Sequence, residues 1–201
     1  LAVDGIDVNY RKDNGVTALY TLCAGGHFSA LKMLLAVDHI DVNQAPDNGV
    51  TPLYIASQQG YSKVVKMLLA VDGIQVNQAN NEECTPLYIA SQEGHSKIVR
   101  MLLAVAGIQV NQQANVYGIR MTPFMSAVSY SHIGIVVLFL QRGIAGHNNI
   151  NEWFHINKTQ PSGRIALYKY AVLLPQQHQP LLDFHLCLLN TQNALVPTSS
   201  L

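Results

Sequence analysis

The sequence predicts an all-α fold, a right-handed curved solenoid of stacked antiparallel helix pairs joined by β-hairpin-like loops. The first observation is a repeat: TPLYIASQ stands at 51–58 and again at 85–92, and 24 of the 34 residues counted from each start are identical. The second is that fainter copies begin at Thr17, one period upstream, and at Thr122, 37 residues downstream. A fixed period of this size indicates a repeat architecture, in which each unit packs only on its neighbours.

The unit that begins at Asp47 shows how the first helix of each repeat is expected to form. Its DNG turn suits a reversal, because Gly tolerates a positive φ and Asp and Asn bond their own backbone. Thr51 followed by Pro52 favours a helix start, and we expect Thr51 and its counterpart Thr85 to be N-caps. Gly60 is expected to end this helix.

A second helix is expected to begin near Ser62 and to end before Gly73. Its apolar residues form one buried stripe, consisting of Val64, Val65, Leu68 and Leu69. Each helix has only about eight or nine residues, fewer than the roughly 12–15 that an isolated helix needs in water. The stripe must therefore be buried against a neighbouring unit, and we expect Leu68 and Leu102 in the core.

These residues resemble the ankyrin repeat family. The T-P-L-H-x-A signature of that family has four counterparts here, TALYTL, TPLYIA, TPLYIA and TPFMSA. Gly-His pairs stand at 26–27 and 94–95, and a D-V-N ending stands at 41–43. The resemblance covers about residues 1–151. It implies an ankyrin-repeat solenoid with a protein-binding function.

The chain departs from the family pattern at the signature histidine and in one loop. Tyrosine or methionine replaces that histidine at Tyr20, Tyr54, Tyr88 and Met125. In the family, the histidine ties neighbouring repeats together through hydrogen bonds. Between Asn111 and Thr122 three additional residues lengthen one hairpin.

The phase of the four threonines gives the expected domain boundaries. Residues 1–12 are the end of a truncated repeat, the four repeats are 13–45, 46–79, 80–115 and 116–150, residues 151–192 are a degenerate capping repeat or an irregular tail, and residues 193–201 are a frayed C-terminus. The opening LAVDGIDVN matches the closing third of a repeat, so we expect a piece of a longer protein. The unit from Asp13 would then expose an apolar face where an upstream repeat packs.

Charge and composition narrow the function classes. Twelve basic and twelve acidic residues leave no net formal charge and no basic stripe, so we expect no nucleic-acid partner. The apolar run from Ile135 to Leu140 is too short for a membrane span, and no secretory signal begins the chain. The three cysteines, Cys23, Cys84 and Cys187, cannot all pair and form no CxxC. We therefore expect a reduced, cytoplasmic setting, with a secreted effector left open.

The sequence gives no support for a catalytic, cofactor or metal site. It contains no G-x-S-x-G, H-E-x-x-H or phosphate-binding glycine loop. His178 and His185 are seven residues apart with Pro180 between them, which does not suit a metal site. Cys84 precedes a helix N-cap that could stabilise a thiolate, but an ordinary turn residue is the favoured interpretation. We expect no enzyme activity and no cofactor.

The predicted function is a monomeric scaffold that binds another protein through the concave surface of hairpins and first helices. In the family, contact residues lie on the hairpin and at the end of the first helix. By register these are Asp47, Asn48, Val50, Gln58, Gln59, Asn81, Glu82, Cys84, Gln92, Glu93, Ile119, Met121, Ser129 and Tyr130. Ile119, Met121 and Tyr130 are apolar or aromatic, as binding anchors often are. The alternative for this loop is that it caps the stack.

Three further alternatives stay open at this point. The repeats could target a catalytic domain of a larger enzyme or effector outside this segment. The weak repeat pattern after Ile150 would also fit a decaying reading frame. Finally, Asn43, Asn77 and Asn111 occupy the register that the family can hydroxylate in animal cells, although bonding of the loop backbone is the simpler role.

Overall fold

The computed structural model describes residues 7–116 and 118–143. Every described residue belongs to one unit of the chain, Leu1–Lys158. The expectations for the chain start, for the capping repeat or tail at 151–192 and for the frayed end at 193–201 therefore concern residues outside the described ranges.

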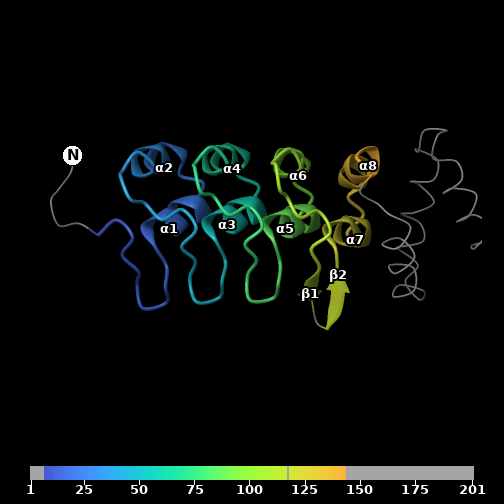
Figure 1. Cartoon of the computed structure of the whole chain (residues 1–201), viewed down its shortest axis with the longest axis horizontal. Helices are drawn as coiled ribbons and strands as arrows, with labels where there is room; N and C mark the ends of the chain where they lie inside the picture. The colour runs from blue at the N-terminus through green and yellow to red at the C-terminus, as the bar shows by residue number, and fades with distance from the viewer. Residues whose placement is uncertain (1–6, 117, 144–201) are drawn as a thin grey trace, which may run out of the picture. The chain divides into compact units, whose positions relative to one another are not determined.

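Eight helices in the described part of the chain form four successive pairs: α1 (Ala18–Ala24) with α2 (Phe28–Leu34), α3 (Pro52–Gln58) with α4 (Ser62–Leu68), α5 (Pro86–Gln92) with α6 (Ser96–Leu102), and α7 (Pro123–Ser129) with α8 (Ile133–Gln141). Figure 1 shows α1, α3, α5 and α7 as an inner row beneath α2, α4, α6 and α8, with loops that project on the far side of the inner row. The predicted helix-pair solenoid is confirmed.

The lengthened loop of the fourth unit forms a short β-hairpin. Strand β1 (Ala114–Val116) pairs antiparallel with β2 (Ile119–Met121), and Ala114 lies opposite Met121. The three residues that lengthen this segment relative to the other units leave room for the ladder. The other described units reverse the chain at the same place without strands.

The inner helices begin where the threonines predict. The hydroxyl of Thr51 accepts a hydrogen bond from the Tyr54 amide at 3.0 Å, and that of Thr85 accepts one from the Tyr88 amide at 3.1 Å. Pro52 and Pro86 occupy the first helical positions, where no backbone donor is needed. Both threonines are buried, so these caps satisfy amides that water does not reach. The predicted N-caps are confirmed.

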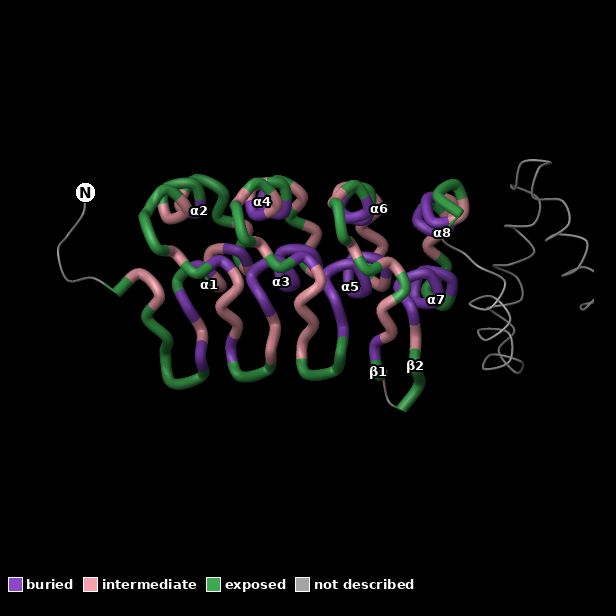
Figure 2. The backbone as a smooth tube through the Cα atoms, viewed as in Figure 1, coloured by how far each residue is buried: buried purple, intermediate pink, exposed green. Residues whose placement is uncertain are grey.

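The core lies between the two rows of helices and between neighbouring pairs. Leu68 of α4 and Leu102 of α6 are both 0% exposed, as the stripe predicts. Helices α3, α5 and α7 each bury six residues, whereas α1 buries two, Leu19 and Cys23. Figure 2 shows this as continuous burial along α3, α5 and α7 and as interrupted burial along α1. Helices α3 and α5, each between two inner helices, and helix α7 are thus better buried than α1.

Hydrogen bonds between units come from histidines other than the one in the family signature. Nε2 of His95 lies 2.9 Å from the carbonyl oxygen of Gln58, and Nε2 of His132 lies 2.7 Å from that of Gln92. A carbonyl oxygen only accepts, so these nitrogens carry the proton. Each histidine stands just before the second helix of its unit and reaches the first helix of the preceding unit. The replacement of the signature histidine therefore leaves the units linked.

Asparagines supply a second set of links along the turns. Asn43 donates from Nδ2 to the Gly73 carbonyl at 2.9 Å and accepts at Oδ1 from the Gln75 amide at 2.8 Å. Asn77 repeats both bonds one unit later, with Gly107 and Gln109. An amide that donates and accepts at once fixes two neighbouring turns relative to each other. The loop-bonding role expected for Asn43 and Asn77 is present.

Candidate protein-binding site

The loop tips and the C-terminal ends of the inner helices hold the residues that the register assigned to a partner. Most of these side chains reach solvent. Exposed are Asp47, Asn48, Gln59, Asn81, Glu82, Glu93, Ile119, Ser129 and Tyr130, and half-buried are Val50, Gln58, Gln92 and Met121. Figure 2 shows the exposed tips as a series on one side of the inner row.

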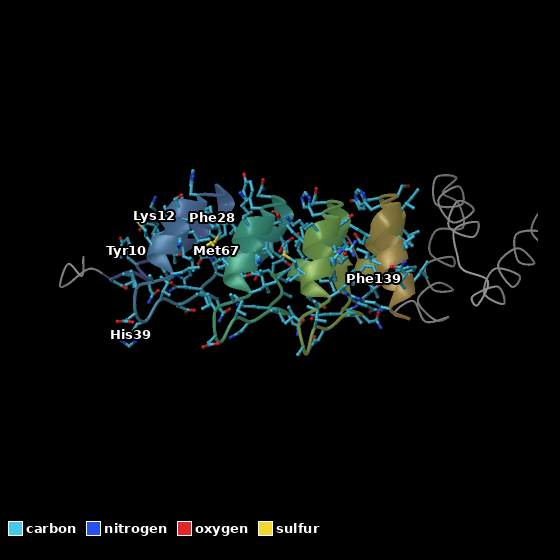
Figure 3. All side chains as sticks on the ribbon, turned by 90° about the horizontal axis from the view of Figure 1, so that it is seen from above. Tyr10, Lys12, Phe28, His39, Met67 and Phe139 are labelled. Carbon is cyan, nitrogen blue, oxygen red and sulfur yellow. The ribbon has the colours of Figure 1, made fainter. Side chains whose placement is uncertain are left out.

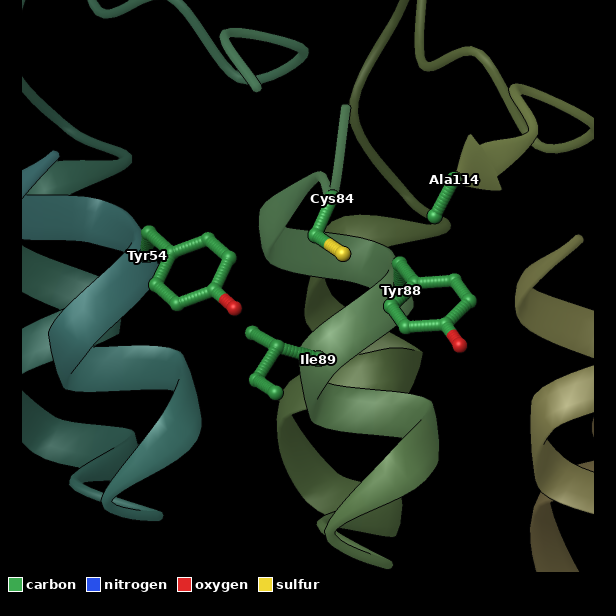
Figure 4. Close-up of a cluster of buried hydrophobic side chains, with 5 residues drawn as sticks. All are labelled: Tyr54, Cys84, Tyr88, Ile89 and Ala114. Atoms are coloured by element: carbon green, nitrogen blue, oxygen red, sulfur yellow. The ribbon is translucent and has the colours of Figure 1, made fainter. Parts of the chain in front are cut away.

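Cys84 is the exception, and its assignment to the contact surface is corrected here. Its side chain is 3% exposed and packs with Tyr54, Tyr88, Ile89 and Ala114. Figure 4 shows Cys84 with Tyr54 on one side and Tyr88 on the other. The residue before the N-cap points into the cluster, so no partner can reach the thiol.

Burial also changes the acidity of this cluster. It raises the pKa of the Cys84 thiol to about 11, and the nearby carboxylates of Glu82 and Glu83 add to the rise. Burial likewise raises the pKa of Tyr88 to about 12, against a smaller opposing effect of the Ser126 hydroxyl. Cys84 is therefore a neutral thiol near pH 7, and the stabilised thiolate considered from its position is absent.

The loop tips are joined to one another by bonds that sequence reasoning did not find. Asn81 donates from Nδ2 to the Asp47 carbonyl at 2.9 Å, and its amide donates to the Asn48 carbonyl at 3.2 Å. The Asn115 amide donates to the Glu82 carbonyl at 3.0 Å. Successive tips thus form one connected edge. The side chain of Asn81, expected to contact a partner, is partly engaged within that edge.

Ion pairs reinforce the same edge. Arg11 contacts Asp47 at 3.1 Å, and Arg120 contacts Glu83 at 3.1 Å, in each case joining one tip to the next. All four side chains are well exposed, so each pair contributes little to stability. Their effect is to orient the charged groups along the edge. Glu83 has a left-handed backbone conformation, with a φ of 61°. The residue at the same position of the preceding unit is Gly49, with a φ of 75°.

Tyr130 is the largest exposed anchor at the end of an inner helix. Its side chain is 56% exposed, and its ring stacks on His132 with centroids 6.4 Å apart and planes 8° apart. The hydrogen bond from His132 to Gln92 holds the imidazole beneath it. The exposed aromatic ring thus lies parallel to an imidazole that is itself positioned by a hydrogen bond.

Ile119, the other exposed apolar residue of this unit, does not join Tyr130 in one cluster. Ile119 is 42% exposed in strand β2, and Tyr130 stands at the opposite end of α7, a helix about 10 Å long at 1.5 Å per residue. Met121, between them in sequence, is half-buried and packs against the Cys84 cluster. The structure thus offers two separate apolar contacts.

The described residues offer hydrogen bonds, charges and apolar anchors. Among residues 7–116 and 118–143, no group of three or more His, Cys, Asp or Glu side chains is arranged to hold a metal ion. No helix within those ranges combines the length and apolarity that a bilayer crossing needs. The exposed hydrogen-bonding groups, charges and apolar side chains suit recognition of another molecule at a surface.

Stacked helix pairs with linked loop tips define a repeat solenoid, a class of protein that presents an extended binding surface. A family model described as ankyrin repeats matches the chain in three copies, at residues 1–80, 47–114 and 73–151. The chain belongs to the ankyrin repeat family. Each match is longer than one 34-residue unit, so three overlapping matches and four helix pairs describe the same segment. No curated protein matches the chain. Ankyrin repeats are in general non-catalytic modules for protein–protein interaction.

Proposed function

We propose that this chain is a scaffold that binds another protein through the connected edge of loop tips and the C-terminal ends of the inner helices. The observation that carries the proposal is Tyr130, an exposed ring that lies parallel to the imidazole of His132. An aromatic side chain that is already ordered loses little entropy on binding. Aromatic anchors are also enriched among the residues that dominate interface energy.

Polar groups at the same register would set the orientation of the partner. Gln59, Glu93 and Tyr130 stand at the C-caps of α3, α5 and α7. The Gln92 amide donates to the Glu93 carboxylate at 3.2 Å, which leaves the carboxylate further acceptor sites for a partner. Such groups favour specificity, while Tyr130 and Ile119 supply the apolar contact area.

The connected edge supports a preorganised surface. Because the tips are already bonded to one another, binding need not order them. We propose repeat units at 13–45, 46–79, 80–115 and 116–150, of which the last three supply the contacts. The proposed scaffold acts as a monomer without a cofactor, on a protein partner.

The test is affinity capture with the purified full chain as bait, followed by mass spectrometry. A variant with Tyr130→Ala and Ile119→Ser should lose the proteins that the parent retains, with a melting temperature within a few degrees of the parent. The matched control is Phe28→Ala with Met33→Ser, which removes two exposed apolar side chains of the outer helix α2, away from the proposed surface. Retention of the same proteins by the first variant would contradict the proposal. A large loss of stability in that variant would assign the two residues to capping.

A further inference from the structure

The outer helices carry a concentration of positive charge that the balanced composition conceals. Every charged residue inside a described helix is basic, and all five lie in the outer row: Lys32 of α2, Lys63 and Lys66 of α4, and Lys97 and Arg100 of α6. The described acidic residues all stand in loops or at a helix cap. Figure 3 looks onto this outer layer, with Phe28 of α2 and Met67 of α4 labelled on it.

Two of the cations of α4 and α6 stand against local electrostatic preferences, whereas Lys66 and Arg100 lie in the last turns, where the helix dipole favours positive charge. Lys63 and Lys97 each occupy the second position of their helix, where the helix dipole disfavours positive charge. Lys63 precedes Lys66 by three residues, and Lys97 precedes Arg100 by three, so each helix pairs like charges on one side. Departures from local rules are expected at functional positions.

These charges are not neutralised within the described residues. All four side chains are exposed, and the ion pairs of residues 7–116 and 118–143 are Arg11–Asp47 and Arg120–Glu83, neither of which involves them. The first turns of α4 and α6 contain no acidic residue. The outer face therefore presents four unpaired cations on two adjacent helices.

The arrangement of the cations indicates the kind of partner. Residues three apart on a helix are about 5–6 Å apart at Cβ, and packed helices are about 8–10 Å apart. The four groups thus form a grid of roughly these dimensions. A helix laid across α4 and α6 with carboxylates at i, i+4, i+7 and i+11 has a rise of about 10.5 Å over seven residues, close to the spacing between the two helices. Arg100 adds a planar donor that can engage a carboxylate with two parallel bonds.

We propose that the outer face of α4 and α6 binds an acidic helical segment of a protein partner. A lipid surface is the less suitable occupant, because Met67 and Met101 beside the cations are half-buried and offer little apolar surface for insertion. A duplex nucleic acid would engage a longer basic track than four groups on two helices. This face is separate from the loop tips and inner-helix ends, so it can be occupied at the same time.

The probe is a synthetic alanine-rich peptide with glutamates at i, i+4, i+7 and i+11, measured by fluorescence anisotropy with the full chain. Binding should weaken steeply between about 50 and about 200 mM salt. Variants Lys63→Gln with Lys97→Gln, and Lys66→Gln with Arg100→Gln, should each weaken it at least about tenfold. The control, Lys12→Gln with Arg142→Gln, changes the net charge equally at exposed positions elsewhere and should have an effect below about twofold.

Further measurements distinguish an acidic helical segment from the other possible partners. A peptide of the same composition with its glutamates scattered around the helix should bind more weakly than the patterned one. The variant with Tyr130→Ala and Ile119→Ser should still bind the patterned peptide, which separates this test from that of the proposed function. Equal losses in the control variant, equal binding of the scattered peptide, or binding of phosphatidylserine vesicles or duplex RNA in place of the peptide would overturn the proposal. Lys63→Gln with Lys97→Gln should also raise the melting temperature. It removes positive charge from the N-terminal ends of α4 and α6 and the repulsion between like charges within each helix.

Discussion

Leu68→Ala should separate packing between repeats from helix propensity. Leu68 is 0% exposed in α4, which contacts both α2 and α6. The change deletes three carbon atoms, which at about 0.8 kcal/mol per methylene corresponds to roughly 2.4 kcal/mol of transfer free energy. A cavity is left between helices that are held on both sides by further pairs, so it should collapse little. We expect a total loss near the middle of the usual range, about 3–4 kcal/mol.

The assay is urea unfolding of the full chain, followed by helical circular dichroism. Met67→Ala is the matched control, because Met67 adjoins Leu68 in the same helix but is only half-buried. It should cost less than about 1.5 kcal/mol. Equal losses in the two variants, or a midpoint for Leu68→Ala indistinguishable from that of the parent, would refute the packing argument.

Two further predictions concern a cap and a thiol. Thr85→Ala should destabilise the chain by about 1 kcal/mol in the same assay, because it leaves the Tyr88 amide without its buried acceptor; a parent-like midpoint would show that the hydroxyl is not capping. Burial raises the pKa of Cys84 from 9.0 to about 11, so the folded state holds the thiol proton more tightly than the unfolded state. The resulting stabilisation should be complete below about pH 9 and should be lost as pH rises towards about 11. Cys84→Ala should reduce that pH dependence of unfolding, to which buried Cys23 also contributes, and an unchanged profile would assign it wholly to other groups.

The sequence predicts the interior of each unit well because those contacts are local. Thr51 caps the helix that it precedes, and Leu68 lies on a stripe whose spacing is visible within a few residues. The period then places the same features in the next unit. Fold class and core therefore follow from pattern and propensity alone.

The candidate surface is less predictable because its details depend on contacts between units. The Asn81 bond to Asp47 joins residues 34 positions apart, and the His132 bond to Gln92 joins residues 40 apart. The sequence of one unit does not show whether a neighbouring unit supplies a hydrogen-bond acceptor. Cys84 was misplaced for the same reason, because the cluster that buries it includes Tyr54 of the preceding unit and Ala114 of the following hairpin.

The asparagine hydrogen bonds between units recur at fixed sequence separations. Asn9, Asn43 and Asn77 each reach a carbonyl 30 residues ahead and an amide 32 residues ahead. An insertion within a helix would shift both bonding groups away from the asparagine side chain, whereas an insertion at a loop tip can project from the edge and leave them in place. The three residues that lengthen the fourth hairpin fall at such a tip, between Asn111 and Thr122. Length variation in this chain should therefore be tolerated as whole units or at the loop tips, and an engineered graft would keep its register only at those places.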